Sequence, residues 1–192
     1  MQMTKAELRK LAADKRNELK TEQKERSILK KLTEFDAFKH AKTVLCYVSR
    51  GDEISTAGII DYCFCNNKTL AVPYCENEFG KMSFYYINST TDLVEGRFGI
   101  PEPDIKNCKA VKSFNDSVII VPALCCDLNG FRLGYGGGYY DIFLAKYKFP
   151  SIALCLSDLI IDSIPLTEYD IAVDAIITEN ETIIINDGGK NG

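Results

Sequence analysis

Val118–Leu144, which reads VIIVPALCCDLNGFRLGYGGGYYDIFL, is the stretch that decides the fold. It begins with an apolar, β-branched run, which predicts a buried strand. A loop follows, then a glycine turn at Gly134–Gly138, in which four of the five residues are glycine. The aromatic segment after the turn predicts a helix. A strand, a turn and a helix in this order are typical of α/β proteins with a parallel sheet.

The glycine turn also predicts a phosphate site. A passage from strand to helix gathers backbone N–H groups and the positive end of a helix at one point. Glycine lets the main chain approach an anion without a Cβ in the way. Arg132 stands just before the turn and can fork onto phosphate oxygens, and Asp141 can hold Mg²⁺ that bridges the phosphates. The alternative is a turn that keeps glycine for packing.

Two familiar nucleotide motifs do not fit the spacing. Walker A requires Lys-Ser or Lys-Thr after its second glycine, and this stretch has neither. The dinucleotide motif G-x-G-x-x-G, begun at Gly134, would require glycine where Tyr139 stands. The glycine turn is therefore of a different kind.

The rest of the chain alternates apolar strand candidates with helix candidates. Helices are predicted at Ala57–Asn66 and Gly138–Tyr147. Strands are predicted at Thr43–Val48, Lys68–Pro73, Met82–Ile87, Val118–Pro122, Ser151–Leu156, Ala175–Thr178 and Thr182–Ile185. We expect one domain over residues 1–192, a three-layer α/β/α fold with a mostly parallel sheet. Phe98–Asp104 is expected to be a proline-rich loop and residues 187–192 a frayed tail.

Residues 1–38 are predicted to form helices that pack on this core. Thr4 and Glu7 have the spacing of a capping box that opens the first helix. Its apolar stripe is expected at Leu8, Leu11, Ala12 and Leu19, and a second helix follows Thr21.

Lys5 and Arg9 are spaced i and i+4 on the first helix, and Arg16 could continue their side. Such a pair is often a solvated surface. It becomes a candidate ligand site if the helix packs near the glycine turn.

Composition excludes several classes of protein. A net charge of −4 and a pI near 5.2 argue against a nucleic-acid-binding protein. The N-terminus lacks an apolar signal segment, and no apolar run reaches the length of a membrane helix. The eight cysteines lack C-x-x-C spacing and stand mostly in apolar runs, which favours reduced, buried thiols. We expect a cytoplasmic monomer that acts on small molecules.

Gly130–Asp141 (GFRLGYGGGYYD) resembles the motif G-x-R-L-G-x-G-x-G-Y-Y-D of the 5-formyltetrahydrofolate cyclo-ligase family, also called methenyltetrahydrofolate synthetases. Gly99–Pro103 looks like the family's central loop. Three other segments are similar and fall in family order, namely Lys5–Arg9, Ser49–Ile54 and Glu168–Asp174. The resemblance spans nearly the whole chain.

The resemblance implies a role for each matching residue. The catalytic residues would be Arg132, Tyr139 and Asp141. Mg²⁺ would be held by Asp141 and Asp170, with Asp174 as the rival second carboxylate. The folate pocket would be lined by Val48, Glu53, Tyr135, Gly136, Gly137, Gly138 and Tyr139. ATP would be bound by Lys5, Arg9, Arg132, Leu133, Gly134, Tyr135, Gly136, Gly137, Gly138, Tyr139 and Tyr140.

These residues also have ordinary structural interpretations. Asp52 and Glu53 could start a helix, Asp170 could be a solvated loop residue, and the tyrosines could serve packing. The resemblance implies ATP-dependent closure of 5-formyltetrahydrofolate to 5,10-methenyltetrahydrofolate. Two rival functions are a relative that binds folate or nucleotide without turnover, and a sugar-phosphate isomerase of similar architecture.

Overall fold

A seven-stranded sheet forms the centre of the computed structural model, which describes residues 3–76, 80–96 and 99–185. The strand order is β12-β11-β9-β6-β1-β2-β3. The strands are β1 (Thr43–Cys46), β2 (Thr69–Cys75), β3 (Met82–Ile87), β6 (Ser117–Pro122), β9 (Ser151–Leu154), β11 (Ala175–Ile177) and β12 (Thr182–Ile184). The five central strands are parallel, and β3 and β12 pair antiparallel at the two edges. The predicted mostly parallel sheet is confirmed.

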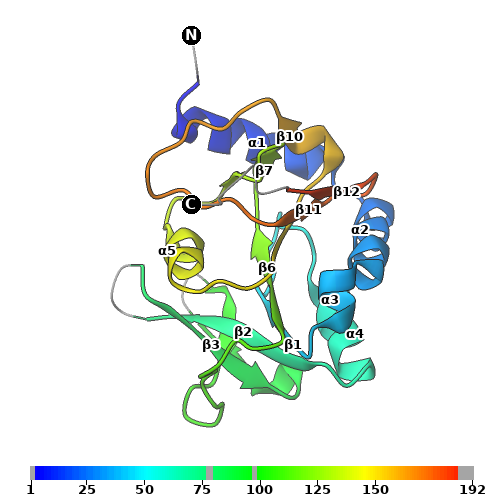
Figure 1. Ribbon diagram of the computed structural model, residues 1–192, viewed down its shortest axis with the longest axis vertical. Helices are drawn as coiled ribbons and strands as arrows, with labels where there is room; N and C mark the ends of the chain where they lie inside the picture. The colour runs from blue at the N-terminus through cyan, green and yellow to red at the C-terminus, as the bar shows by residue number, and fades with distance from the viewer. Residues whose placement is uncertain (1–2, 77–79, 97–98, 186–192) are drawn as a thin grey trace, which may run out of the picture.

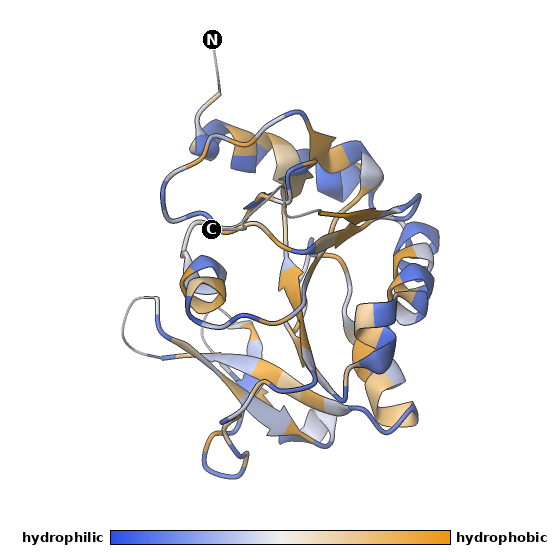
Figure 2. Ribbon diagram, viewed as in Figure 1, coloured by the Kyte–Doolittle hydropathy of each residue, from blue (hydrophilic) through white to orange (hydrophobic). Residues whose placement is uncertain are grey.

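Helices cover both faces of this sheet (Figure 1). On one side lie α2 (Glu22–Glu34), α3 (Asp36–His40) and α4 (Ala57–Cys65), and on the other lies α5 (Tyr139–Lys146). The sheet is apolar where the helices cover it, and the outer side of α2 is hydrophilic (Figure 2). β9 is buried along its whole length, as a strand with two covered faces must be. The expected three-layer α/β/α fold is confirmed.

The first helix, α1 (Lys5–Leu19), lies across the carboxyl end of the parallel strands. Its predicted capping box is present, with the Thr4 hydroxyl accepting from the Glu7 amide and the Glu7 carboxylate accepting from the Thr4 amide. Leu8 and Ala12 are buried. Leu11, expected on the buried stripe, is 46% exposed, because the helix presents its charged residues to the sheet end on a neighbouring stripe.

Two smaller sheets were not expected from the sequence. The short strands β7 (Cys125–Asp127), β8 (Arg132–Leu133) and β10 (Ile160–Ile161) form one of them. Strands β4 (Leu93–Glu95) and β5 (Pro101–Pro103) form a two-stranded sheet. Between β7 and β8 the chain reverses at Gly130, whose φ is +87° and whose Cβ position lies 2.8 Å from the carbonyl oxygen of Val173. This hairpin delivers Arg132 and the glycine turn to the sheet end.

Several predicted boundaries shift by a few residues. The strand expected to reach Val48 ends at Cys46, and the strand expected to reach Leu156 ends at Leu154, where each leaves the ladder. The expectation of a loop over the proline-rich segment is wrong for Pro101–Pro103, which pairs with β4. Phe98 and the predicted frayed tail at 187–192 lie outside the described residues.

All eight cysteines lie in the described part of the chain and are reduced thiols, as predicted. Cys46, Cys63, Cys125, Cys126 and Cys155 are buried. Within residues 3–76, 80–96 and 99–185, no helix is both long and apolar enough to span a membrane.

Candidate active site at the carboxyl end of the sheet

Three cations of α1 face the sheet end from one stripe of the helix. At 3.6 residues per turn, positions 5, 9 and 16 lie within about 40° of one another around the helix axis. Lys5 bonds to Asp170 after β10, Arg9 to Gly134 after β8, and Arg16 to Ala123 after β6. The first helix packs directly on the glycine turn, and the Lys5–Arg9 pair is therefore a candidate ligand site.

Lys5 pairs with Asp170 from the far end of the chain. Its Nζ donates to both carboxylate oxygens at 2.7 and 2.6 Å. Asp170 also accepts from the amide and hydroxyl of Thr167. Burial works to raise the pKa of Asp170, but the hydrogen bonds from Lys5 and Thr167 outweigh it, so the pKa lies below its usual range. Asp170 is therefore an engaged carboxylate and not a solvated loop residue.

Arg9 fixes the start of the glycine turn. Its Nε donates to the carbonyl oxygen of Gly134 at 2.8 Å. The guanidinium then lies under Gly136, whose φ is +102° and whose Cβ position is 3.3 Å from the Arg9 Cζ. A side chain at Gly136 would meet both an unfavourable backbone conformation and this guanidinium. Glycine is required here by geometry.

Arg132 and Asp141 form a second cation–carboxylate pair. Arg132 is 7% exposed, and its Nη1 donates to Asp141 Oδ1 at 3.2 Å and to the Ile171 carbonyl oxygen at 3.0 Å. The Ile171 amide donates back to Asp141 Oδ1 at 3.1 Å. Since Ile171 follows Asp170 in the chain, the two predicted metal carboxylates share one corner of the site. Asp141 lies in the first turn of α5, as predicted.

Asp174, the rival second carboxylate, has a structural task. Its Oδ2 accepts from the amide and the hydroxyl of Ser151 at 2.8 and 2.7 Å, so it caps the start of β9. It therefore lies at the amino end of that strand, whereas the glycine turn lies at the carboxyl end of the sheet. This placement favours Asp170 over Asp174 as the partner of Asp141.

Glu53 is buried in the loop after β1, and the alternative that it starts a helix is wrong because α4 begins at Ala57. Its Oε2 accepts from the Arg50 amide at 2.9 Å. Burial raises the pKa of Glu53 above its usual range, although the Arg50 amide and nearby cations oppose the shift. Val48, also predicted for the folate pocket, is half-buried and packs against the core.

The tyrosines of the turn have different surroundings. Tyr135 is 41% exposed, whereas Tyr139 and Tyr140 are half-buried. Burial raises the pKa of Tyr140 well above its ordinary value. The ring of Tyr139 lies so close to Gly137 that a Cβ there would be 2.8 Å from the ring carbons.

Arg16 and Asp52 belong to this constellation, although neither was proposed as a site residue from the sequence. Arg16 is 1% exposed and donates to the Asp52 carboxylate, to the Tyr135 hydroxyl and to the Ala123 carbonyl oxygen. The signal available in the sequence was its place on the Lys5–Arg9 stripe. What the sequence could not supply was the segment that Arg16 faces.

Mg²⁺ fits the donor set of this corner as a shared ion. Among the described residues, no group of three or more His, Cys, Asp or Glu side chains is arranged to hold a metal. Mg²⁺ does not need such a cage, because it is usually bound through one or two carboxylates together with substrate phosphates and water. Asp141 can serve as one ligand, and Asp170 can serve as the second once Lys5 moves to an incoming phosphate.

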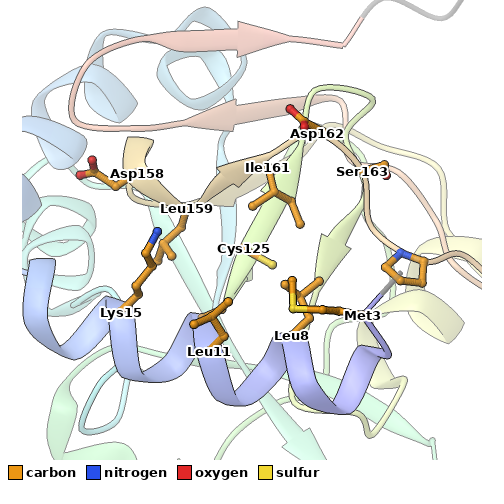
Figure 3. A pocket seen from close by; sticks show the side chains of 12 residues that line it. Met3, Leu8, Leu11, Lys15, Cys125, Asp158, Leu159, Ile161, Asp162 and Ser163 are labelled. Atoms are coloured by element: carbon orange, nitrogen blue, oxygen red, sulfur yellow. The ribbon is translucent and has the colours of Figure 1, made fainter. Parts of the chain in front are cut away.

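A cavity of about 300 Å³ lies on the other side of α1 (Figure 3). In the close view, Leu8 and Leu11 project from the helix toward Cys125, Leu159 and Ile161. None of the residues that line it was predicted to bind ATP or folate. The chemistry is concentrated instead where the charged stripe of α1 meets the glycine turn.

The charged groups gather at the carboxyl ends of the parallel strands. Enzymes with this α/β architecture bind their ligands at that end of the sheet. A model of the 5-formyltetrahydrofolate cyclo-ligase family matches residues 2–179. The chain belongs to this family and is a ligase. This membership overturns the alternative of a sugar-phosphate isomerase.

Named relatives agree with the family match. A probable 5-formyltetrahydrofolate cyclo-ligase of Caenorhabditis elegans is 29% identical, over 95% of this chain and 96% of the relative. The mitochondrial 5-formyltetrahydrofolate cyclo-ligase of Arabidopsis thaliana is 31% identical, over 87% of this chain and 69% of the relative.

Two solved structures have the same fold. The 5,10-methenyltetrahydrofolate synthetase of Aquifex aeolicus superposes with a TM-score of 0.82 at 30% identity, covering 99% of this chain and 97% of that one. The synthetase of Mycoplasma pneumoniae has a TM-score of 0.71 at 22% identity, covering 92% of this chain and 99% of that one, and supports the fold alone.

Proposed function

We propose that this protein closes 5-formyltetrahydrofolate to 5,10-methenyltetrahydrofolate and couples the closure to cleavage of ATP into ADP and phosphate. The observation that carries the proposal is the contact of the charged stripe of α1 with the glycine turn, where Arg9 holds the Gly134 carbonyl and Lys5 holds Asp170. Family membership supplies the substrate class.

The reaction needs ATP because a formamide oxygen is a poor leaving group. In the proposed sequence, the N5-formyl oxygen attacks the γ-phosphorus of ATP, and the bond from that phosphorus to the ADP oxygen breaks. N10 then adds to the activated formyl carbon and releases its proton to solvent. The carbon–oxygen bond breaks, and the oxygen departs with the phosphate. The new N10–carbon bond closes the ring.

Phosphoryl transfer asks a protein mainly for positioning and for neutralisation of charge. Lys5, Arg9 and Arg132 supply cations, and the glycine turn supplies main-chain N–H groups with little side chain in the way. Asp141 and Asp170 would hold Mg²⁺, which neutralises phosphate charge when bound. Lys5 and Asp170 pair with each other, and an incoming phosphate would take the place of Asp170 as the partner of Lys5.

The folate would lie on the side of Val48 and Glu53. A buried carboxyl whose pKa is raised can exchange hydrogen bonds with a polar heterocycle such as a pterin. Tyr135 and Tyr139 flank the glycines between the nucleotide and folate sides. An aromatic cover here would keep water from the phosphorylated intermediate. We expect the protein to act as a monomer in the cytoplasm.

The decisive assay mixes the protein with 5-formyltetrahydrofolate, ATP and Mg²⁺. We expect the methenyl chromophore to appear together with an equal amount of ADP. ADP release without the chromophore, or neither product, would contradict the proposal, and binding of both ligands without turnover would identify a non-catalytic relative.

Asp141→Ala tests the metal role. We expect turnover to be abolished while the fold is retained, since the side chain of Asp141 is partly exposed and its partner Arg132 keeps the bond to the Ile171 carbonyl oxygen. The matched control is Asp158→Ala, which also removes a carboxylate paired with a cation, but in the segment Ser157–Leu159. Activity retained in Asp141→Ala would refute the metal role.

A further inference from the structure

Arg16 joins three segments that meet at the site. Its Nη1 donates to the Ala123 carbonyl oxygen at 3.0 Å, just after β6. Its Nη2 donates to the Asp52 carboxylate in the loop after β1 and to the Tyr135 hydroxyl at 2.5 Å in the glycine turn. Arg16 itself comes from α1, so a single guanidinium holds both predicted ligand loops against the N-terminal helix.

This arrangement is a costly way to stabilise a fold. Arg16 is 1% exposed, and its Nε is buried without a hydrogen-bond partner in the part of the chain that the structure describes. Removing a cation from water costs free energy that its partners only partly return, and an apolar side chain often serves a core as well or better. Leu8 and Ala12 already fill the buried stripe beside it. The guanidinium therefore points to a task other than packing.

Tyr135 is the group that depends most on Arg16. It stands between Gly134 and Gly136 and is 41% exposed. The ring centroid lies 5.7 Å from the Arg16 Cζ and 5.2 Å from the Arg50 Cζ. Its hydroxyl is 3.5 Å from Asp52 Oδ2, the same oxygen that Arg16 contacts. The tip of the glycine turn is thus held in place by contacts of the Tyr135 side chain with the guanidinium groups of Arg16 and Arg50.

We propose that Arg16 is a positioning residue for the reaction: it acts through the Tyr135 hydroxyl to set the tip of the glycine turn against the Asp52–Glu53 loop. The inference rests on the proposed function, in which ATP and folate meet at that turn. Arg16 touches neither ligand in this scheme. Its work is to hold the two loops at the separation that the transferring phosphoryl group requires, where an error of about 1 Å costs about 100-fold in rate.

The test compares Arg16→Lys, Tyr135→Phe and the double variant. Lysine keeps the positive charge but lacks the rigid planar fork with which the guanidinium donates from two nitrogens to separate acceptors. Phenylalanine keeps the ring and loses only the hydroxyl. We expect each single variant to lower kcat/KM for 5-formyltetrahydrofolate about 10-fold or more, mainly through kcat. We expect kcat/KM of the double variant to lie within about 2-fold of that of the less active single variant, because both changes remove the same interaction.

The matched control is Lys24→Met, which breaks the ties of α2 to Asp158 and Glu179 away from the site. It should reduce stability toward urea and leave kcat/KM unchanged. Unchanged kcat/KM in Arg16→Lys, or additive losses in the double variant, would overturn the inference. If Arg16→Lys does not fold, Tyr135→Phe and Asp52→Asn decide, and unaltered kcat/KM in both would also overturn it.

A second readout does not depend on activity. In protein labelled with 3-fluorotyrosine, the ¹⁹F resonance of Tyr135 is the one missing from Tyr135→Phe. We expect Arg16→Lys to shift or broaden this resonance and Lys24→Met to leave it in place. A Tyr135 resonance unmoved in Arg16→Lys contradicts the inference. Absence of turnover in the unmodified protein would contradict the proposed function alone.

Discussion

Glu53 is the carboxyl group among the predicted site residues whose ionisation the fold disfavours. Its pKa is raised by burial, so the folded state prefers the protonated form. The stabilising contribution of this group is complete below its unfolded pKa near 4.5 and is lost as the pH rises through the higher folded pKa. Near neutral pH, the ionised carboxylate of Glu53 lowers the stability of the folded protein. A hydrogen bond to bound folate would offset this loss.

Glu53→Gln should therefore be more stable than the unmodified protein at pH 7 to 8. The difference should shrink as the pH falls toward about 4.5, where the glutamate becomes protonated. Urea unfolding at a series of pH values measures it, with exposed Glu34→Gln as the control. An advantage for Glu53→Gln that is independent of pH would contradict the assignment of burial as the cause. We also expect weaker folate binding in this variant.

Arg132→Ala should have two effects, because its Nη1 already bonds to Asp141 and to the Ile171 carbonyl. We expect the free energy of unfolding to fall by about 1.5–3 kcal/mol for the lost charged hydrogen bonds. We expect KM for ATP to rise as well. Arg26→Ala removes an exposed i,i+4 pair and should cost about 0.5 kcal/mol or less. If Arg132→Ala is as stable as the unmodified protein but has a raised KM for ATP, Arg132 contributes to ligand binding alone.

At this scale the sequence predicted residue types better than contacts. Arg132 and Asp141 were singled out because they flank the glycine turn, and the structure brings them together. Arg16 was noticed only as a continuation of a stripe, since its partners Asp52 and Tyr135 are 36 and 119 residues away in the chain. Spacing along a helix predicts a face, but not what that face meets.

Among the elements, the glycine turn has the most specific backbone requirement. Gly136 has φ +102° with Arg9 beneath it, whereas at Gly134 no described heavy atom lies within 4 Å of the Cβ position. We expect Gly136→Ala to cost about 1–2 kcal/mol from backbone strain and to displace Arg9. Gly134→Ala is the matched control and should be tolerated.

Urea unfolding and the KM for ATP measure both glycine variants. A larger loss in Gly134→Ala than in Gly136→Ala would contradict the geometry of the turn. A loss of stability in Gly136→Ala with normal KM for ATP would separate the turn's conformation from its predicted phosphate role.

The main strands and helices were predictable because their apolar patterns are long enough for a period to be recognised. Met82–Ile87 matches its predicted strand at both ends, and the helix after Thr21 begins at Glu22. The sheet of β7, β8 and β10 was missed because strands of two or three residues show no period. Pro101–Pro103 was assigned to a loop for its prolines, yet proline is tolerated in an edge strand.

For the whole molecule, ligand binding should be measurable as added stability. The proposed nucleotide site joins α1 to the glycine turn and to the segment of Asp170, so only the folded chain presents it. At a concentration about 100 times its Kd, Mg²⁺-ATP should add about 2.7 kcal/mol to the free energy of unfolding.

Thermal unfolding with and without EDTA separates the contribution of the metal. Lys5→Met should remove much of the nucleotide effect, and Lys10→Met, on the same helix but off its site-facing stripe, should keep it. Equal stabilisation of these two variants would contradict the part assigned to the Lys5 ammonium.

The pairing of Lys5 with Asp170 has a further consequence for synthesis and for truncation. These two residues are 165 positions apart, so the ribosome must add 165 residues after Lys5 before the pair can form. The paired strands β1 and β2 can exist earlier, but the anion pocket cannot. The proposed nucleotide site can therefore be completed only after Asp170 has been synthesised, and a truncation that removes the segment of Asp170 would take away one side of it.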